Sequence, residues 1–175
     1  MPRCKLRSAA VAAGLIAFPM TYAHAEGFFA RMTGFNETPA IFSDGRGTFQ
    51  LDLDTSANMA RYTLTYSGLS SPVTQGHIHF SKRHVAGGII VWLCQSATNP
   101  GPAGTPMCPP GDGTVTGTIT PASIVAVPEQ LVPAGDFDVL TEALFTKTAY
   151  ANVHTTNAPA GEIRGQIRAS ESDDE

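Results

Sequence analysis

Two neighbouring segments in which apolar and polar residues alternate strictly fix the fold class of this chain. Every second residue is apolar in 47–53, and residues 60–66 repeat the pattern after a turn-like stretch at 54–58. Successive side chains of a strand point to opposite faces, so each segment predicts a strand with one buried face. The residues predicted to face the core are Phe49, Leu51, Leu53, Tyr62, Leu64 and Tyr66.

Most of the remaining chain also has strand composition, in short segments separated by Gly, Pro, Asn and Ser. The unbroken apolar run 89–94 predicts a strand buried on both faces, with Trp92 in the core, and 149–154 predicts a central strand. Only 137–147 favours a helix, capped by Asp136 or Asp138. We therefore expect an all-β fold, an antiparallel β-sandwich or barrel with at most one short helix. Further strands are expected at 28–32, 73–80, 113–120 and 162–167.

The first 25 residues have the composition of a signal peptide. A basic start is followed by an uncharged apolar run and then by Ala23-His24-Ala25, small residues at the positions that a signal peptidase reads. We expect cleavage after Ala25 and export to the periplasm or the extracellular space. The alternative cut after Ala23 would leave His24 at the mature N-terminus. No segment is long and apolar enough to predict a transmembrane helix.

The charge of the mature chain argues against nucleic acid and anionic membrane surfaces as partners. Removing Arg3, Lys5 and Arg7 from the 11 basic residues leaves 8, against 15 acidic ones, a balance of −7. Such a domain is not expected to bind nucleic acid. We place one domain at 26–169, and an acidic, disordered tail at 170–175.

Cys94 and Cys108 are the two cysteines of the mature chain, and an even number in an exported protein predicts a disulfide. The loop between them has thirteen residues and is rich in Pro, Gly, Ser, Thr and Asn. A bridge of this span stabilises by about 3 kcal/mol in the chain-entropy model.

Several blocks together resemble the CHRD domain, named after chordin and also found singly in bacterial exported proteins. They are Glu37-Thr38-Pro39, Gly76-His77-Ile78-His79, the Gly88–Leu93 run, Tyr150–Thr155 and Pro159–Ile167. The resemblance covers nearly the whole mature chain and implies an all-β extracellular domain. The loop between Cys94 and Cys108 departs from the family pattern.

The histidines carry the concentrated side-chain chemistry of the chain. His77 and His79 lie two residues apart and should share one strand face, with Ile78 turned to the core, and His154 belongs to another expected strand. Three imidazoles can hold copper or zinc. The His-x-His strand and the disulfide are similar to those of copper- and zinc-binding superoxide dismutases. The chain lacks the second histidine-rich loop and the later glycine-rich signature of those enzymes.

Three functions follow from this pattern. The first is an exported binding module that holds copper or zinc at His77, His79 and His154. The second is a structural or protein-interaction domain with no metal, in which the rings are buried fasteners bonded to backbone carbonyls. The third is a copper-dependent redox enzyme. Glu162 is expected to pair with Arg164 at the surface or to orient a histidine ring, and His84 is expected to face solvent.

Overall fold

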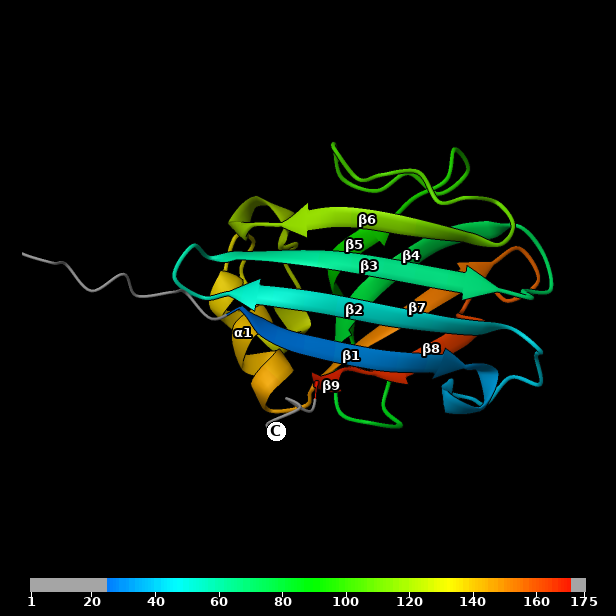
Figure 1. The fold of residues 1–175 in the computed structure, drawn as a ribbon, viewed down its shortest axis with the longest axis horizontal. Coiled ribbons are helices and arrows are strands. Elements are labelled where there is room, and N and C mark those ends of the chain that lie inside the picture. Colours follow the sequence, from blue (N-terminus) through cyan, green and yellow to red (C-terminus); the bar gives the residue numbers. More distant parts are fainter. Residues whose placement is uncertain (1–24, 171–175) are drawn as a thin grey trace, which may run out of the picture.

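A single nine-stranded antiparallel sheet makes up most of the protein (Figure 1). The structure is a computed structural model and describes residues 25–170. The strand order is β5-β4-β7-β8-β1-β2-β3-β6, and β9 also pairs with β1. The strands are β1 (Glu26–Thr33), β2 (Arg46–Asp54), β3 (Met59–Ser67), β4 (Val73–Phe80), β5 (Gly88–Cys94), β6 (Gly113–Ile119), β7 (Ala149–Thr155), β8 (Ile163–Gln166) and β9 (Arg168–Ala169).

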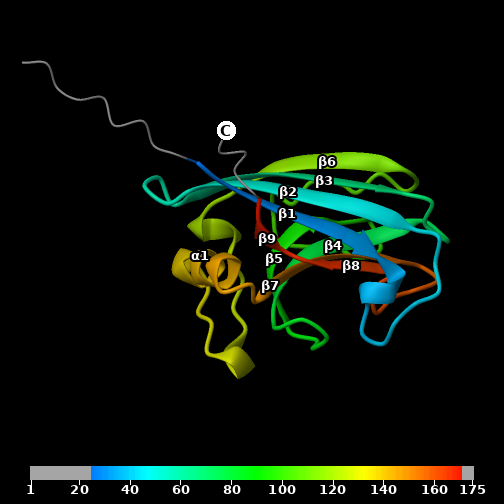
Figure 2. The same ribbon diagram turned by 60° about the horizontal axis from the view of Figure 1, so that its bottom comes forward.

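The sheet folds over on itself into two layers, which gives a flattened, nearly closed barrel. Strands β6, β3, β2 and β1 form one layer, and β5, β4, β7 and β8 form the other (Figures 1 and 2). The edge strands β5 and β6 are not paired with each other, but the Tyr62 hydroxyl on β3 donates to the Leu93 carbonyl on β5 at 2.6 Å across the gap. The predicted all-β antiparallel sandwich or barrel is confirmed.

Within residues 25–170, helical structure is confined to one α-helix and three short 3-10 turns. The helix α1 (Phe137–Phe145) closes one end of the barrel, and Asp136 caps it by accepting a hydrogen bond from the Asp138 amide (Figure 2). The 3-10 turns are η1 (Gly34–Asn36), η2 (Pro121–Ser123) and η3 (Pro128–Gln130). No helix within residues 25–170 has the length and apolarity needed to cross a membrane.

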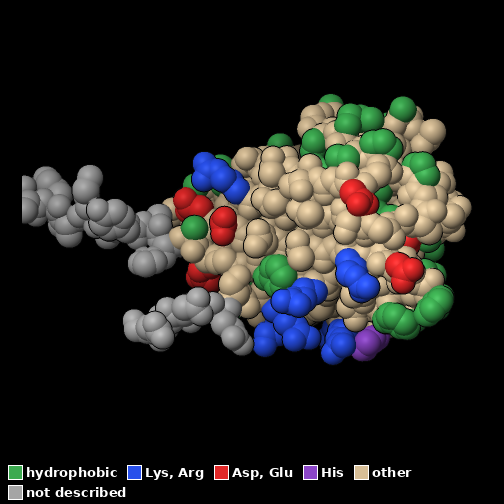
Figure 3. Space-filling view, turned by 45° about the vertical axis from the view of Figure 1, so that its right-hand side comes forward, with side chains coloured by type: hydrophobic (Ala, Val, Ile, Leu, Met, Phe, Trp, Pro, Cys, Tyr) green, Lys and Arg blue, Asp and Glu red, His purple; other side chains and the backbone are tan. Residues whose placement is uncertain are grey.

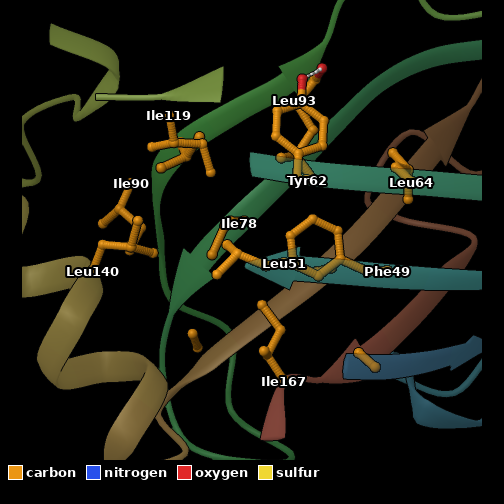
Figure 4. Close-up of a cluster of buried hydrophobic side chains, with 14 of the residues drawn as sticks. Phe49, Leu51, Tyr62, Leu64, Ile78, Ile90, Leu93, Ile119, Leu140 and Ile167 are labelled. Atoms are coloured by element: carbon orange, nitrogen blue, oxygen red, sulfur yellow. Dashed lines mark hydrogen bonds between the residues drawn. The ribbon is translucent and has the colours of Figure 1, made fainter. Parts of the chain in front are cut away.

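The apolar core lies between the two layers and against α1 (Figure 4). Phe49, Leu51 and Leu64, on β2 and β3, face Ile78 on β4 in the other layer. All four side chains are at most 1% exposed. The predicted inward faces of β2 and β3 are therefore confirmed, as is the fully buried central strand β7. Burial of these alternating faces is the main stabilising contribution to the fold.

Strand β5 differs from its prediction. It is an edge strand that pairs only with β4 within the sheet, and both Ile89 and Trp92 are half-buried. Trp92 lies outside the apolar core and on the same face as its register partner His77. The apolar run is long because the disulfide loop covers its outer side: a Cβ at Gly101 would lie 2.6 Å from the Trp92 ring. A short apolar run does not reveal whether a sheet or a loop provides the cover.

The predicted disulfide is present, with Cα atoms of Cys94 and Cys108 5.0 Å apart. The loop that it closes is also ordered by Gln95, which donates to the Thr105 carbonyl and accepts from the Gly101 amide. Of the expected terminal segments, the structure describes only Ala25 of the signal peptide and Ser170 of the tail. The Ser170 amide donates to the Gly27 carbonyl at 2.8 Å, so the folded domain extends one residue beyond its expected end.

Replacing both cysteines by alanine is expected to lower the free energy of unfolding by about 3 kcal/mol, because the thirteen-residue loop gains freedom in the unfolded chain. Denaturant titration of the wild type with and without a reducing agent measures this difference. The Cys94→Ala/Cys108→Ala protein is the control and should not respond to the reducing agent. A loss below 1 kcal/mol would show that Gln95 and Trp92 hold the loop without the bridge.

Candidate metal centre

The three predicted histidines meet on the outer side of β4 and β7, away from the apolar core. Cross-strand register places Gln75 opposite His154 and His77 opposite Asn152. Because alternate residues of a strand share a face, His77 and His79 lie beside Asn152 and His154, while Ile78 is fully buried in the core. His77 is 0%, His79 7% and His154 6% exposed. One ligand atom from each ring lies within 4.8 Å of the others.

Aromatic side chains wall the cluster. The Trp92 ring contacts His77 edge to face at a centroid distance of 4.4 Å. The Tyr150 ring stacks on His79 at 4.7 Å and 3°. On the other side of Tyr150 lies the guanidinium of Arg164, with its Cζ 3.4 Å from the ring centroid. These aromatic contacts fix the orientation of the His77 and His79 rings and exclude solvent from them.

Two backbone carbonyls determine the tautomers of His79 and His154. Nδ1 of His79 lies 2.9 Å from the Gly87 carbonyl oxygen, and Nδ1 of His154 lies 3.0 Å from that of Pro159. A carbonyl oxygen only accepts, so Nδ1 of each ring carries the proton and donates. In a neutral imidazole this leaves a lone pair on Nε2. Both Nε2 atoms face Asn152, at 3.0 Å and 3.1 Å from its Oδ1.

His77 completes the convergence. Its Nδ1 lies 3.3 Å from Nε2 of His154, and its Nε2 is buried without a hydrogen-bond partner among the described residues. Burial, with the neighbouring histidines, lowers the pKa of His77 to about 2. Burial also lowers the pKa of His79 to about 4, against the opposing bond to Gly87, and lowers the pKa of His154. All three rings are therefore neutral at physiological pH, the state in which imidazole binds metals.

The distances between the ring nitrogens show how far the three rings must move to bind one ion. Zn–N bonds are about 2.0–2.1 Å, so tetrahedral ligand nitrogens lie roughly 3.4 Å apart. The contact between His77 Nδ1 and His154 Nε2, at 3.3 Å, already has this spacing. The separations in the cluster are at most 4.8 Å, so they must close by at most about 1.4 Å for all three rings to bind one ion.

Glu37 lies in the same region of the structure, and it was not grouped with the histidines from the sequence alone. It follows η1 and is 7% exposed. Gly161 leaves the space for it, since a Cβ there would lie 2.5 Å from Glu37 Oε1 and 2.9 Å from Asn152 Nδ2. Burial raises the pKa of Glu37 to about 7, against the opposing effects of the Thr38 amide, Arg164 and Asn152. Its block Glu37-Thr38-Pro39 was the signal available in the sequence.

Both expectations for Glu162 were wrong. The residue is 0% exposed and contacts neither Arg164 nor a histidine; its carboxylate accepts from the hydroxyls of Ser43 and Thr155 and from the amide and hydroxyl of Ser70. Burial alone would raise the pKa of Glu162, but these bonds lower it. Glu162 precedes β8, so its side chain does not follow the alternation that the sequence suggested. His84 is exposed on the 81–87 loop, as expected.

Arg164, predicted at the surface, is only 2% exposed. Besides lying on Tyr150, it donates to the carbonyls of Val85 at 2.9 Å and Lys82 at 3.3 Å. These bonds hold the 81–87 loop, including the Gly87 carbonyl that bonds His79, against the sheet. Arg164 therefore positions the cover of the histidine cluster.

Comparison with known proteins gives one match. The sequence model of the CHRD domain matches residues 28–167, which include every residue of the histidine cluster, and searches of curated proteins and of solved structures returned no significant match. Because the match spans most of the chain, the protein belongs to the CHRD domain family.

Proposed function

We propose that this protein is an exported binding module that holds one copper or zinc ion through His77 Nδ1, His79 Nε2 and His154 Nε2. The carrying observation is the pair of backbone carbonyls on His79 and His154. They fix the Nδ1–H tautomer of both rings and direct two lone pairs to one point, as partners of metal-ligating histidines do. The basic and apolar N-terminus and the Cys94–Cys108 disulfide support export.

The chemistry of the donors favours a cation at this point. Nε2 of His79, Nε2 of His154 and Oδ1 of Asn152 are all acceptors, yet the two Nε2 atoms lie only 3.0 Å and 3.1 Å from Oδ1. A positive ion between acceptors removes their mutual repulsion. Imidazole nitrogens suit copper and zinc, and the Asn152 amide oxygen supplies a further neutral ligand. No carboxylate is needed, which agrees with the neutral, enclosed setting.

A structural role is the second candidate, and one observation favours it. Apart from His77 Nε2, every ring nitrogen of the cluster has a polar neighbour without any metal. Rotating the Asn152 amide by half a turn would let its Nδ2 donate to both Nε2 atoms. The cluster would then fasten β4, β7 and the covering loops as a polar network.

Metal content and affinity distinguish the two candidates. We expect the purified wild type to bind one ion of copper or zinc per chain, and His77→Ala/His79→Ala to bind at least about 100-fold more weakly, since two of three ligands are lost. Elemental analysis after dialysis and competition with a chromophoric chelator measure both quantities.

His84→Ala is the matched control, because this histidine is exposed and outside the cluster. It should bind as the wild type does. Circular dichroism of each variant confirms that the sheet is retained. Negligible uptake by both the wild type and the double variant would exclude the metal and leave the structural role.

A further inference from the structure

A groove lies on the opposite layer of the sheet, apart from the histidine cluster. An open groove of about 1080 Å³ runs across β1, β2, β3 and β6, and none of His77, His79 and His154 lines it. A hollow of this size on the outer face of a sheet is a candidate binding site.

The charge of the groove is opposite to that of the chain. Five arginines and one acidic residue line it, although the mature chain has a balance of −7 by the counts given above. Within residues 25–170 no carboxylate oxygen lies within 4.0 Å of the nitrogens of these five side chains, although Glu37 interacts electrostatically with Arg164 and Asp54 with Arg61. Lys and Arg side chains gather along the lower edge of the face shown in Figure 3. The arginines are Arg31, Arg61, Arg83, Arg164 and Arg168.

The floor of the groove carries hydrogen-bonding groups in cross-strand rows. Strand register aligns Arg168, Phe29, Gln50, Thr63 and Thr116 across β9, β1, β2, β3 and β6. Adjacent strands are about 4.8 Å apart, so this row spans roughly 19 Å. It offers a guanidinium, an amide and two hydroxyls in line, with one partly exposed aromatic ring.

Arg164 anchors one end of the groove. It is 2% exposed and held by Tyr150 and by the Val85 and Lys82 carbonyls, yet it also lines the groove. Its Nη1 donates to the Thr38 hydroxyl and its Nη2 to the two carbonyls, so it adds a fixed positive charge at this end of the groove rather than a free fork. The exposed Arg31, Arg61, Arg83 and Arg168 supply the direct contacts to an anionic ligand.

We propose that this groove binds an acidic polysaccharide. Carboxylate or sulfate groups pair with the arginines, and sugar hydroxyls bond to Gln50 and the threonines. The groove lies on a sheet face, where an extended peptide has no free backbone groups to pair with. Of the aromatic residues in it, Phe28 and Tyr62 are buried and Phe29 alone is partly exposed, so it lacks the succession of stacking rings that binds single-stranded nucleic acid.

Binding of defined polymers to the purified protein tests the proposal. Polygalacturonate provides carboxylates, dextran sulfate provides sulfates, and neutral dextran is the blank. We expect binding of at least one acidic polymer and none of dextran, with an affinity that falls as salt rises. Arg31→Gln/Arg168→Gln should weaken binding at least about tenfold, because two charge-assisted contacts are lost.

Arg46→Gln is the matched control, since Arg46 is exposed on β2 but does not line the groove. It should bind within about twofold of the wild type, and thermal unfolding should show all variants folded. An equal loss in Arg46→Gln, no binding of either acidic polymer, or tighter binding of single-stranded or duplex DNA at the same salt would overturn the proposal. His77→Ala/His79→Ala should bind both polymers unchanged, which separates this site from the metal.

Discussion

Replacing Glu162 by alanine is expected to lower the free energy of unfolding by about 3–5 kcal/mol, a loss typical of a broken buried polar network. Oε1 accepts from the Ser43 hydroxyl at 2.6 Å and the Ser70 amide at 2.8 Å, and Oε2 accepts from the hydroxyls of Ser70 at 2.7 Å and Thr155 at 2.6 Å. Alanine would leave four donors without their acceptor. Three of these donors, on Ser43 and Ser70, belong to connections between strands, which would lose their attachment to Glu162.

A conservative variant separates the network from the charge. Glu162→Gln keeps Oε1 for Ser43 and the Ser70 amide, and its amide can donate to the two remaining hydroxyls, which rotate to accept. We expect a loss of only about 1–2 kcal/mol. Urea titration at pH 7 measures both values, with Glu129→Ala, on the exposed side of η3, as a surface control near zero. An alanine variant as stable as this control would contradict the role assigned to Glu162.

The architecture was predictable from sequence because one-sided burial leaves a period of two. Phe49, Leu51 and Leu64 follow that period and are buried, and Asp136 caps α1 as its position before an apolar helical stripe indicates. His77 and His79 could be placed on one face by the same rule. Their meeting with His154 depends on the β4–β7 pairing, which the sequence only suggested.

The cover of the site could not be predicted, because it comes from loops rather than strands. Glu37 reaches Asn152 across a sequence separation of more than a hundred residues, through the space left at Gly161. Trp92 looked like a core residue because an apolar run has the same composition whether it packs inside the barrel or under a loop. Glu162 was misassigned because alternation ceases to apply just before a strand begins.

Lowering the pH from 7 to 5 is expected to reduce the free energy of unfolding of the metal-free protein by about 2–5 kcal/mol. In the unfolded chain each cluster histidine takes up a proton as the pH falls below about 6.5. In the folded protein burial holds the pKa of His77 at about 2 and of His79 at about 4, and also lowers that of His154. Their stabilising contribution is therefore present above pH 6.5 and lost as the pH falls towards the folded values.

Glu37 acts in the opposite direction. Its folded pKa, raised by burial to about 7, exceeds the ordinary 4.5, so the folded protein takes up this proton before the unfolded chain does. The contribution of Glu37 is present at low pH and lost as the pH rises through 7, and it offsets about one of the three histidines. The net difference is one to two protons, or about 1–3 kcal/mol per pH unit between pH 5 and 6.5.

Three variants assign this slope to its sources, measured by urea titration in chelator at several pH values. His77→Phe keeps the contact with Trp92 and removes one titrating ring, so the slope should fall by about 1.4 kcal/mol per pH unit, and Glu37→Gln should steepen it by a similar amount. His84→Ala, exposed and outside the cluster, should keep the wild-type slope. A wild-type stability that does not change between pH 7 and 5 would mean that the rings admit protons in the folded state, and hence that the cluster is open to water.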